Sequence, residues 1–255
     1  MTRIALFASG NGTNAENLIR RLTKGQVVVL LCNNPQAPVL DRARRLGVPA
    51  EVFTAEQLQN PTTEPPADSA APGVLSILQA YKADLLVLSG FLWKIPEHLL
   101  QAYPGRILNI HPALLPAFGG KGMYNMHVHR AVLEHLRNRS ASANNTVTDS
   151  APAATPPANA TTANDGSSSA NTSQHTEAVL PVPAPTPPYG VSGITIHLID
   201  SHYDRGQILF QATCPVDRDD TPESLAQKVH ALEYKYFPHV VDHYIDTALM
   251  RDKTL

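Results

Sequence analysis

The sequence predicts an α/β protein built on an open, doubly wound, mostly parallel sheet. Short apolar runs alternate with segments of helical character over the first 110 residues. The run at 84–89 is almost continuously apolar, which is typical of a central parallel strand covered on both faces. Two further strand-like runs follow each other late in the chain, where we expect antiparallel strands.

The expected elements follow in order. Strand 3–8 ends in a Gly-rich turn, and a helix over about 14–22 follows that turn. Strand 26–33 leads to a helix over 39–46, for which Gly47 is the stop signal. A short third strand at 50–53, a loop at 60–72 and a helix at 74–81 come before strand 84–89. A helix at 96–103 and a strand at 106–110 complete the first half.

The late part of the chain is expected to add strands at 194–198 and 207–212 and a helix at 222–244. Open α/β sheets bind their ligands at the carboxyl ends of their strands. The residues that follow each strand are therefore the candidate site residues.

The amino-acid composition limits the classes of function that the protein can have. The 255 residues are 43% hydrophobic and 16% charged, and the formal net charge is −2. This balance argues against a bulk nucleic-acid binder. The longest apolar run, 27–32, is too short to cross a bilayer, and the N-terminus does not resemble a signal peptide. A cytosolic protein is expected by elimination, with its two cysteines, Cys32 and Cys214, buried and reduced.

The segment at about 140–188 is rich in Ala, Pro, Thr, Ser and Asn and contains no aromatic residue before Tyr189. Such a segment buries too little apolar surface to offset the entropy of ordering. We interpret it as a disordered insertion within a single domain that spans residues 1–255. Long surface loops are tolerated because the closure entropy grows slowly with length.

The first strand is followed by the sequence Ser9-Gly-Asn-Gly-Thr-Asn14. Its glycines let the backbone approach a ligand, and the helix that follows directs its N–H groups and positive dipole end to the same place. This pattern predicts a phosphate-binding site. The alternative is a tight turn between strand and helix that binds no ligand. A dinucleotide site is disfavoured because no acidic residue follows the second strand. The chain also lacks a P-loop sequence.

The fourth strand is followed by an apolar loop, Leu92 to Ile95, that holds Trp93, the one tryptophan. This loop either binds a flat heterocycle or caps the core. The fifth strand leads into Asn109-Ile-His111, whose polar side chains lie on the same side of an extended segment. An amide can donate to a developing oxyanion and an imidazole can transfer a proton.

Two carboxylates, Asp200 and Asp204, follow the strand at 194–198. A carboxylate beside His111 would favour the imidazolium and raise its pKa. The sequence leaves open which of the two reaches His111, or whether both only belong to a polar turn.

Together, Ser9–Asn14, Gly90-Phe91, Asn109-Ile-His-Pro-Ala-Leu-Leu-Pro116 and Asp200-x-x-x-Asp204-x-Gly206 resemble the phosphoribosylglycinamide formyltransferases, folate-dependent enzymes of purine (IMP) synthesis. The resemblance implies a Rossmann-like formyltransferase fold and transfer of the formyl group of 10-formyltetrahydrofolate to the amine of 5-phosphoribosylglycinamide. It implies catalytic roles for Asn109 as oxyanion donor, His111 as proton donor and Asp204 as the group that raises the pKa of His111. The substrate would contact Gly12, Thr13, Asn14 and Glu233. The folate would contact Leu92, Trp93, Lys94, Ile95 and Asn109.

No metal is expected, because His127 and His129 have no nearby carboxylate or cysteine and are interpreted as a helix start. Small-molecule substrates are the expected partners of a monomer or homodimer that binds neither nucleic acid nor membrane. Two related enzymes are alternatives: a methionyl-tRNA formyltransferase is expected to carry a further C-terminal domain, and a formyltetrahydrofolate hydrolase a further N-terminal one. A non-catalytic nucleotide-binding regulator would need none of Asn109, His111 and Asp204.

Overall fold

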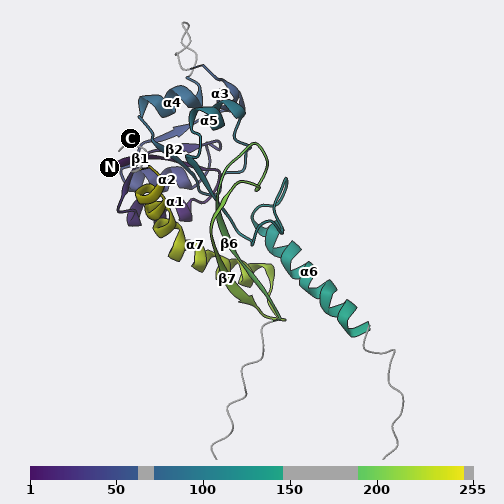
Figure 1. The fold of residues 1–255 in the computed structure, drawn as a ribbon. Helices are drawn as coiled ribbons and strands as arrows, with labels where there is room; N and C mark the ends of the chain where they lie inside the picture. Colours follow the sequence, from purple (N-terminus) through teal and green to yellow (C-terminus); the bar gives the residue numbers. More distant parts are fainter. Residues whose placement is uncertain (63–71, 146–188, 250–255) are drawn as a thin grey trace, which may run out of the picture.

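The computed structural model describes residues 1–62, 72–145 and 189–249 (Figure 1). In this part of the chain one seven-stranded sheet has the strand order β3-β2-β1-β4-β5-β6-β7. The strands are β1 Thr2–Ala8, β2 Gly25–Cys32, β3 Ala50–Val52, β4 Leu85–Leu88, β5 Ile107–His111, β6 Gly190–Leu198 and β7 Ile208–Val216. The first five are parallel, and β6 and β7 are antiparallel to their neighbours. The expected fold class is therefore confirmed.

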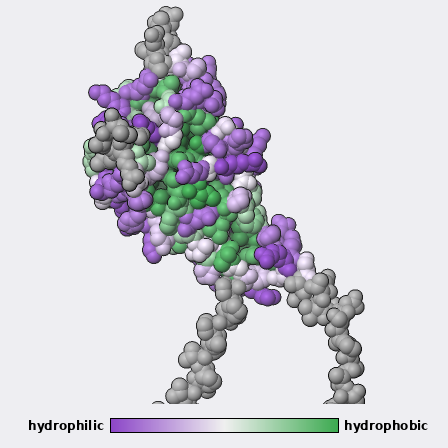
Figure 2. All heavy atoms as spheres, in the orientation of Figure 1, coloured by the Kyte–Doolittle hydropathy of each residue, from purple (hydrophilic) through white to green (hydrophobic). Residues whose placement is uncertain are grey.

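The helices cover both faces of the sheet (Figure 1). One apolar cluster joins α1 (Thr13–Arg21), α2 (Val39–Arg45), α6 (Met126–Asn145) and α7 (Pro222–Tyr244) to one face. The other cluster joins α3 (Ala55–Gln59), α4 (Val74–Ala80) and α5 (Glu97–Ala102) to the opposite face. A π-helical turn, Ile245–Leu249, follows α7. Figure 2 shows apolar residues gathered over the middle of one face of the molecule.

The strand order positions the site. The chain runs from β1 outward to β2 and β3, then returns to place β4 on the other side of β1. Neighbouring connections therefore leave β1 and β4 in opposite directions, which opens a crevice at the carboxyl ends of these strands. The Gly-rich loop after β1, the Trp93 loop after β4 and the Asn-x-His segment of β5 all reach this edge.

The expected elements agree with the structure to within a few residues. Two helices go beyond them: α6, of which only the start was expected, and α3, for which no element was predicted. This short helix is fixed by a capping box, in which the Thr54 hydroxyl accepts from the Gln57 N–H and the Gln57 side chain accepts from the Thr54 N–H. Cys32 and Cys214 are free and buried, as expected.

Helix α6 continues to Asn145, a few residues beyond the expected start of the insertion at about residue 140. Ala141 and the serines tolerate a helix here: the hydroxyls of Ser140 and Ser142 donate back to the carbonyls of Leu136 and Asn138. The rest of the expected insertion, 146–188, lies outside the described residues. In the described part of the chain no helix is both long and apolar enough to cross a membrane.

We predict that Gly193→Ala destabilises the pairing of β6 with β7. A methyl group there would lie 2.0 Å from the carbonyl oxygen of Ala212, so the strands must separate. The expected loss in the free energy of unfolding is about 1–3 kcal/mol, the usual cost of overpacking. Urea unfolding would measure it, with Gly10→Ala as control because nothing lies within 4 Å of the added methyl. Equal stability of the two variants would contradict the prediction that a methyl group at position 193 separates β6 from β7.

Candidate active site

The loop after β1 has the geometry of an anion site. Gly12 is the N-cap of α1 and has a φ of 75°, which favours glycine. A Cβ on Gly12 would also lie 2.1 Å from a methyl of Val39, so no larger residue fits. The Arg42 side chain fixes the loop by donating to the carbonyl and side-chain oxygens of Asn11. The first N–H groups of α1 are thereby directed to the crevice.

Glu233 of α7 lies beside this loop. The Nδ2 of Asn14 donates to Glu233 Oε2 at 2.8 Å, across a sequence separation of more than 200 residues. Glu233 is 5% exposed. Burial raises its pKa to about 7, and the bond from Asn14 offsets only part of this effect. Three of the residues implied in substrate binding, Gly12, Asn14 and Glu233, are therefore close together.

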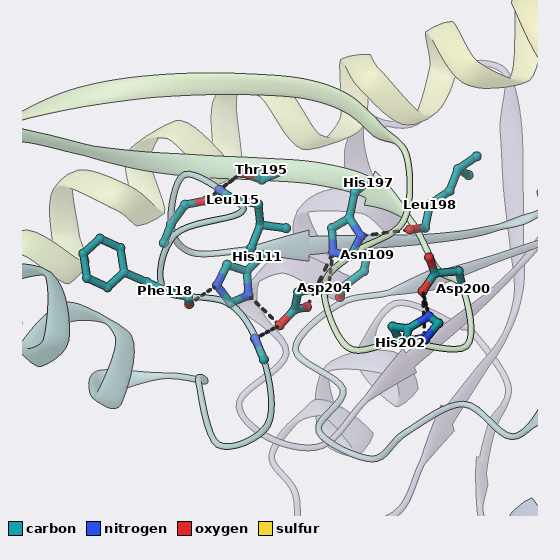
Figure 3. A network of polar contacts seen from close by, with 12 residues as sticks. Asn109, His111, Leu115, Phe118, Thr195, His197, Leu198, Asp200, His202 and Asp204 are labelled. Carbon is teal, nitrogen blue, oxygen red and sulfur yellow. Dashed lines mark hydrogen bonds and ion pairs between the residues drawn. The ribbon is translucent and has the colours of Figure 1, made fainter.

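The register of β5 against β6 brings polar residues into contact. Asn109 is paired with His197, and His111 with Thr195. Side chains opposite each other in an antiparallel pair have Cβ atoms roughly 5 Å apart. All four side chains therefore belong to one buried cluster, seen from close by in Figure 3.

His197 fixes the orientation of the Asn109 amide. The His197 Nδ1 lies 2.9 Å from the Leu198 carbonyl oxygen, which can only accept, so Nδ1 carries the proton. Nε2 is then an acceptor for the Asn109 Nδ2, 3.1 Å away. Burial lowers the pKa of His197 and keeps the ring neutral. The Asn109 amide is thus anchored through one N–H, and its second N–H is available to an oxyanion.

His111 is held in one tautomer by the Phe118 carbonyl. The Nε2 of His111 donates to this oxygen at 2.8 Å, which leaves Nδ1 as the unprotonated nitrogen of the neutral ring. Asp204 Oδ2 lies 3.7 Å from Nδ1, which is too far for a direct hydrogen bond. His111 is buried, and this burial lowers its pKa although Asp204 acts in the opposite direction. Asp204 thus raises the pKa of His111, as expected, but burial has the larger effect and the net shift is downward.

Asp204, and not Asp200, reaches the cluster. Its backbone has a φ of 54°, and its Oδ2 accepts from the Gly120 N–H at 2.9 Å. Its Oδ1 lies 3.7 Å from His197 Nε2, so the carboxylate lies between the two imidazoles (Figure 3). Asp200 accepts instead from the N–H of His202, within its own turn. The structure thus settles the choice that the sequence left open.

A hydroxyl on β6 holds the segment that follows His111. The Thr195 hydroxyl donates to the Ala113 carbonyl at 2.7 Å and accepts from the Leu115 N–H at 2.9 Å. Gln211 of β7 donates to both Thr195 Oγ1 and the Leu115 carbonyl. Because Thr195 is fully buried, these bonds have no competition from water, and they fix the loop that carries Phe118.

The apolar loop after β4 has both buried and exposed side chains. Ile95 is 3% exposed and packs in the core, whereas Leu92 is 47% and Trp93 37% exposed. The Trp93 ring packs edge-on against Phe53 and Phe91, which gives it a firm support. The Lys94 Nζ lies 5.8 Å from the ring centroid of Tyr203, in the same loop as Asp204. The loop therefore presents an apolar surface beside the loop that carries Asp204.

Several polar atoms at this edge lack a partner. Among the described residues, the buried Asn14 Oδ1, Asn33 Oδ1 and Ser89 Oγ make no hydrogen bond. They follow β1, β2 and β4 respectively. Buried polar groups are normally satisfied, so this grouping is typical of a site that a ligand or water completes.

His197, Thr195 and Phe118 were not among the residues predicted from the sequence. The strand at 194–198 has polar residues at alternate positions, Thr195 and His197, between apolar ones. Because β6 is buried on both faces, such a pair is unusual, and this pattern was the available signal. Phe118 acts through its backbone carbonyl, for which the sequence carries no signal.

His127 and His129 lie in the first turn of α6, as the expected helix start requires. No group of three metal-ligating side chains occurs in the described ranges.

The chain matches the family model described as formyl transferase over residues 2–149 and 189–241. It is 34% identical over 244 residues to the chloroplastic phosphoribosylglycinamide formyltransferase of Arabidopsis thaliana, covering 94% of this chain but 64% of that protein. It is 28% identical over 245 residues to the phosphoribosylglycinamide formyltransferase of Bacillus subtilis strain 168, and the match covers 94% of this chain and 93% of that protein. The chain thus spans about two thirds of the plant relative and nearly all of the bacterial one.

Solved structures share the fold. The glycinamide ribonucleotide transformylase 1 of Symbiobacterium toebii aligns with a TM-score of 0.65 and 27% identity, over 96% of this chain and 88% of that one. The phosphoribosylglycinamide formyltransferase of Streptococcus pneumoniae TIGR4 aligns with a TM-score of 0.62 and 26% identity, over 96% of this chain and 99% of that one.

We predict that Thr195→Val destabilises the protein by roughly 2 kcal/mol or more, because it leaves buried backbone groups of Ala113 and Leu115 without partners. Thr195→Ser is the control, since it keeps the hydroxyl. Urea unfolding of both variants checks this expectation, and a Val variant as stable as the Ser variant would contradict it.

We also predict a pH-dependent contribution from Glu233. Because its folded pKa, about 7, is raised above its ordinary value of 4.5, its contribution to stability is complete below pH 4.5 and is lost as the pH rises through 7. Glu233→Gln stays neutral and still accepts from Asn14. Its advantage over the parent protein, measured by urea unfolding, is expected to grow between pH 4.5 and pH 8, to about 3 kcal/mol at most. A constant difference would contradict the shifted pKa.

Proposed function

The chain belongs to the formyl transferase family, and on this premise we propose that it transfers the formyl group of 10-formyltetrahydrofolate to the amine of 5-phosphoribosylglycinamide, a step of purine (IMP) biosynthesis. The observation that carries this proposal is the grouping of Asn109, His111 and Asp204 between an anion loop and an apolar aromatic loop. The two loops suit the two substrates, one a phosphate ester and the other a flat heterocycle.

The ribonucleotide is proposed to bind at the N-terminus of α1. Its phosphate would accept from the backbone N–H groups of Gly12, Thr13 and Asn14, with the helix dipole favouring its charge. Glu233 would accept from ribose hydroxyls at the same place. The Asn14–Glu233 hydrogen bond supports this reading, because it places the carboxyl beside the loop.

The folate is proposed to bind against the loop after β4. The pterin would lie against Leu92 and Trp93, with the backbone of Ile95 supporting the loop and Lys94 at its rim. The exposed, well-packed Trp93 supports this role over that of a mere core cap, since a fully capping ring would be buried.

The chemistry needs one addition and one elimination. The amine attacks the formyl carbon, and the second N–H of Asn109 donates to the oxyanion that forms. The His111 Nδ1 takes the proton that the amine loses, and Asp204 stabilises the imidazolium. His111 then donates this proton to N10 of the folate as the C–N10 bond breaks. The amine itself is the nucleophile, so the scheme uses no covalent enzyme intermediate and no metal.

We propose further that residues 1–255 form one domain. The support is that β6 extends the same sheet as β5, and that α7 packs in one apolar cluster with α1. The cytosolic location and the choice between monomer and homodimer stay predictions of the sequence.

A coupled absorbance assay tests the function. Purified protein is mixed with 5-phosphoribosylglycinamide and 10-formyltetrahydrofolate, and release of the deformylated folate is followed. Release that requires the ribonucleotide supports the transferase. Release without it points to a hydrolase, and no release with folded protein leaves a binding protein as the alternative.

We expect His111→Ala and Asp204→Asn each to lower turnover by a factor on the order of 10²–10⁴, the usual scale for a positioned acid or base. Steady-state kinetics in the same assay measure this loss. The matched control for the carboxylate is Asp200→Asn, in the same turn but bonded to the His202 N–H, which should keep near-parental turnover. Equal loss in both Asp variants would indicate a folding defect of the turn rather than catalysis by Asp204.

A further inference from the structure

A cavity of about 520 Å³ lies between α6, the segment that follows β5 and the start of β6. Its apolar lining includes Phe118, Val132 and Leu136, and the C-terminal half of α6 extends from it away from the rest of the molecule (Figure 1). The volume lies in the range of small-molecule sites, which are mostly apolar with a few placed polar groups.

One polar group in this cavity lacks a partner. Ser192 is 2% exposed, lines the cavity, and has a buried hydroxyl without a hydrogen bond to the described residues. Strand alternation directs its side chain to the same face as Ile194 and Ile196, which pack in one cluster with Val132 of α6. The hydroxyl therefore points into the layer that contains the cavity. An unpaired buried hydroxyl is costly, and a ligand could satisfy it.

Arg139 is the charged side chain of the cavity lining. Arg139 and His135 line the cavity, and no carboxylate does. Arg139 is exposed and has no ion pair with a described residue. A guanidinium beside an apolar wall suits a ligand that combines a carboxylate with an apolar body.

Phe118 connects the cavity to the cluster that contains His111. The Phe118 side chain lines the cavity and packs edge-on against His135, while its carbonyl holds His111 Nε2. A molecule that contacts this ring therefore acts on the hydrogen bond that sets the tautomer of His111.

We propose that this cavity binds a small amphipathic carboxylate, with its charge on Arg139, a hydrogen bond to Ser192 and its apolar body against Phe118. Occupancy changes the position of His111 and thereby the rate of the reaction. The binding step does not depend on the proposed function, whereas the effect on rate rests on it.

The probe is 3-phenylpropionate, with its neutral amide as the matched ligand. Calorimetric titration of the full chain is expected to give one site with a Kd near or below about 1 mM, as the size of the probe allows. Arg139→Leu should weaken binding at least about fivefold, as should use of the amide, because each removes the charge pair. Arg137→Leu is the matched control: it lies on the same helix but lines a different hollow, and should bind within about twofold of the parent.

Ser192→Ala gives a second readout. This substitution should weaken binding of the probe and raise the melting temperature of the ligand-free protein, because it removes an unsatisfied hydroxyl. A hydroxyl with a purely structural partner would lower the melting temperature instead, and that result would overturn its assigned role.

Three outcomes overturn the proposal. The first is that the parent protein does not bind the probe at millimolar concentration. The second is that Arg139→Leu and Arg137→Leu bind the probe with equal affinity. The third is that the probe binds only after residues 146–188 are deleted, since the chain itself would then fill the cavity. The effect on rate is tested separately: saturating probe should shift the pH profile of formyl transfer in the parent but not in Arg139→Leu. Inhibition competitive with the folate in both proteins would place the probe in the active site and refute the coupling. An absence of formyl transfer without probe would refute the proposed function and leave the binding result intact.

Discussion

The antiparallel pairing of β5 with β6 in one register is the constraint on which the candidate active site depends. It sets Asn109 opposite His197 and His111 opposite Thr195. Because side chains alternate with a period of two, a slip of one residue would turn His197 and Thr195 to the other face of the sheet. Asn109 would then lose the acceptor that orients its amide, and the loop after His111 would lose its anchoring hydroxyl.

The same pairing explains the electrostatics of the cluster. Strands buried on both faces exclude water, so the imidazoles of His111 and His197 are neutral, and their hydrogen-bond roles are set by the backbone carbonyls of Phe118 and Leu198. Among the described residues, the Asp204 carboxylate lies 3.7 Å from both rings, but its effect on their pKa values does not outweigh that of burial. A site of this kind is prepared for a proton that arrives with the substrate, since a positive charge on His111 would have its counter-ion in place.

The two proposed substrate surfaces adjoin this cluster because of the strand order. The order of β1, β4 and β5 brings three connecting loops to one edge, although their residues are separated by up to 100 positions. Gly12 and the N-terminus of α1 form the proposed anion site, and Trp93, supported by Phe53 and Phe91, forms the proposed apolar wall. The unsatisfied atoms of Asn14, Asn33 and Ser89 gather at the same edge, where ligand groups can complete them.

The sequence by itself determined the class of the fold, the order of most of its elements and the residue types of the candidate site. Hydrophobic periodicity and the glycines of the loop after β1 are local properties, so they can be read without coordinates. Tertiary structure decided the choice of Asp204 over Asp200, the partnership of Asn109 with His197, and the link from Asn14 to Glu233. It also decided that burial, and not Asp204, controls the pKa of His111. These depend on strand register and on desolvation, and both arise only when distant segments pack together.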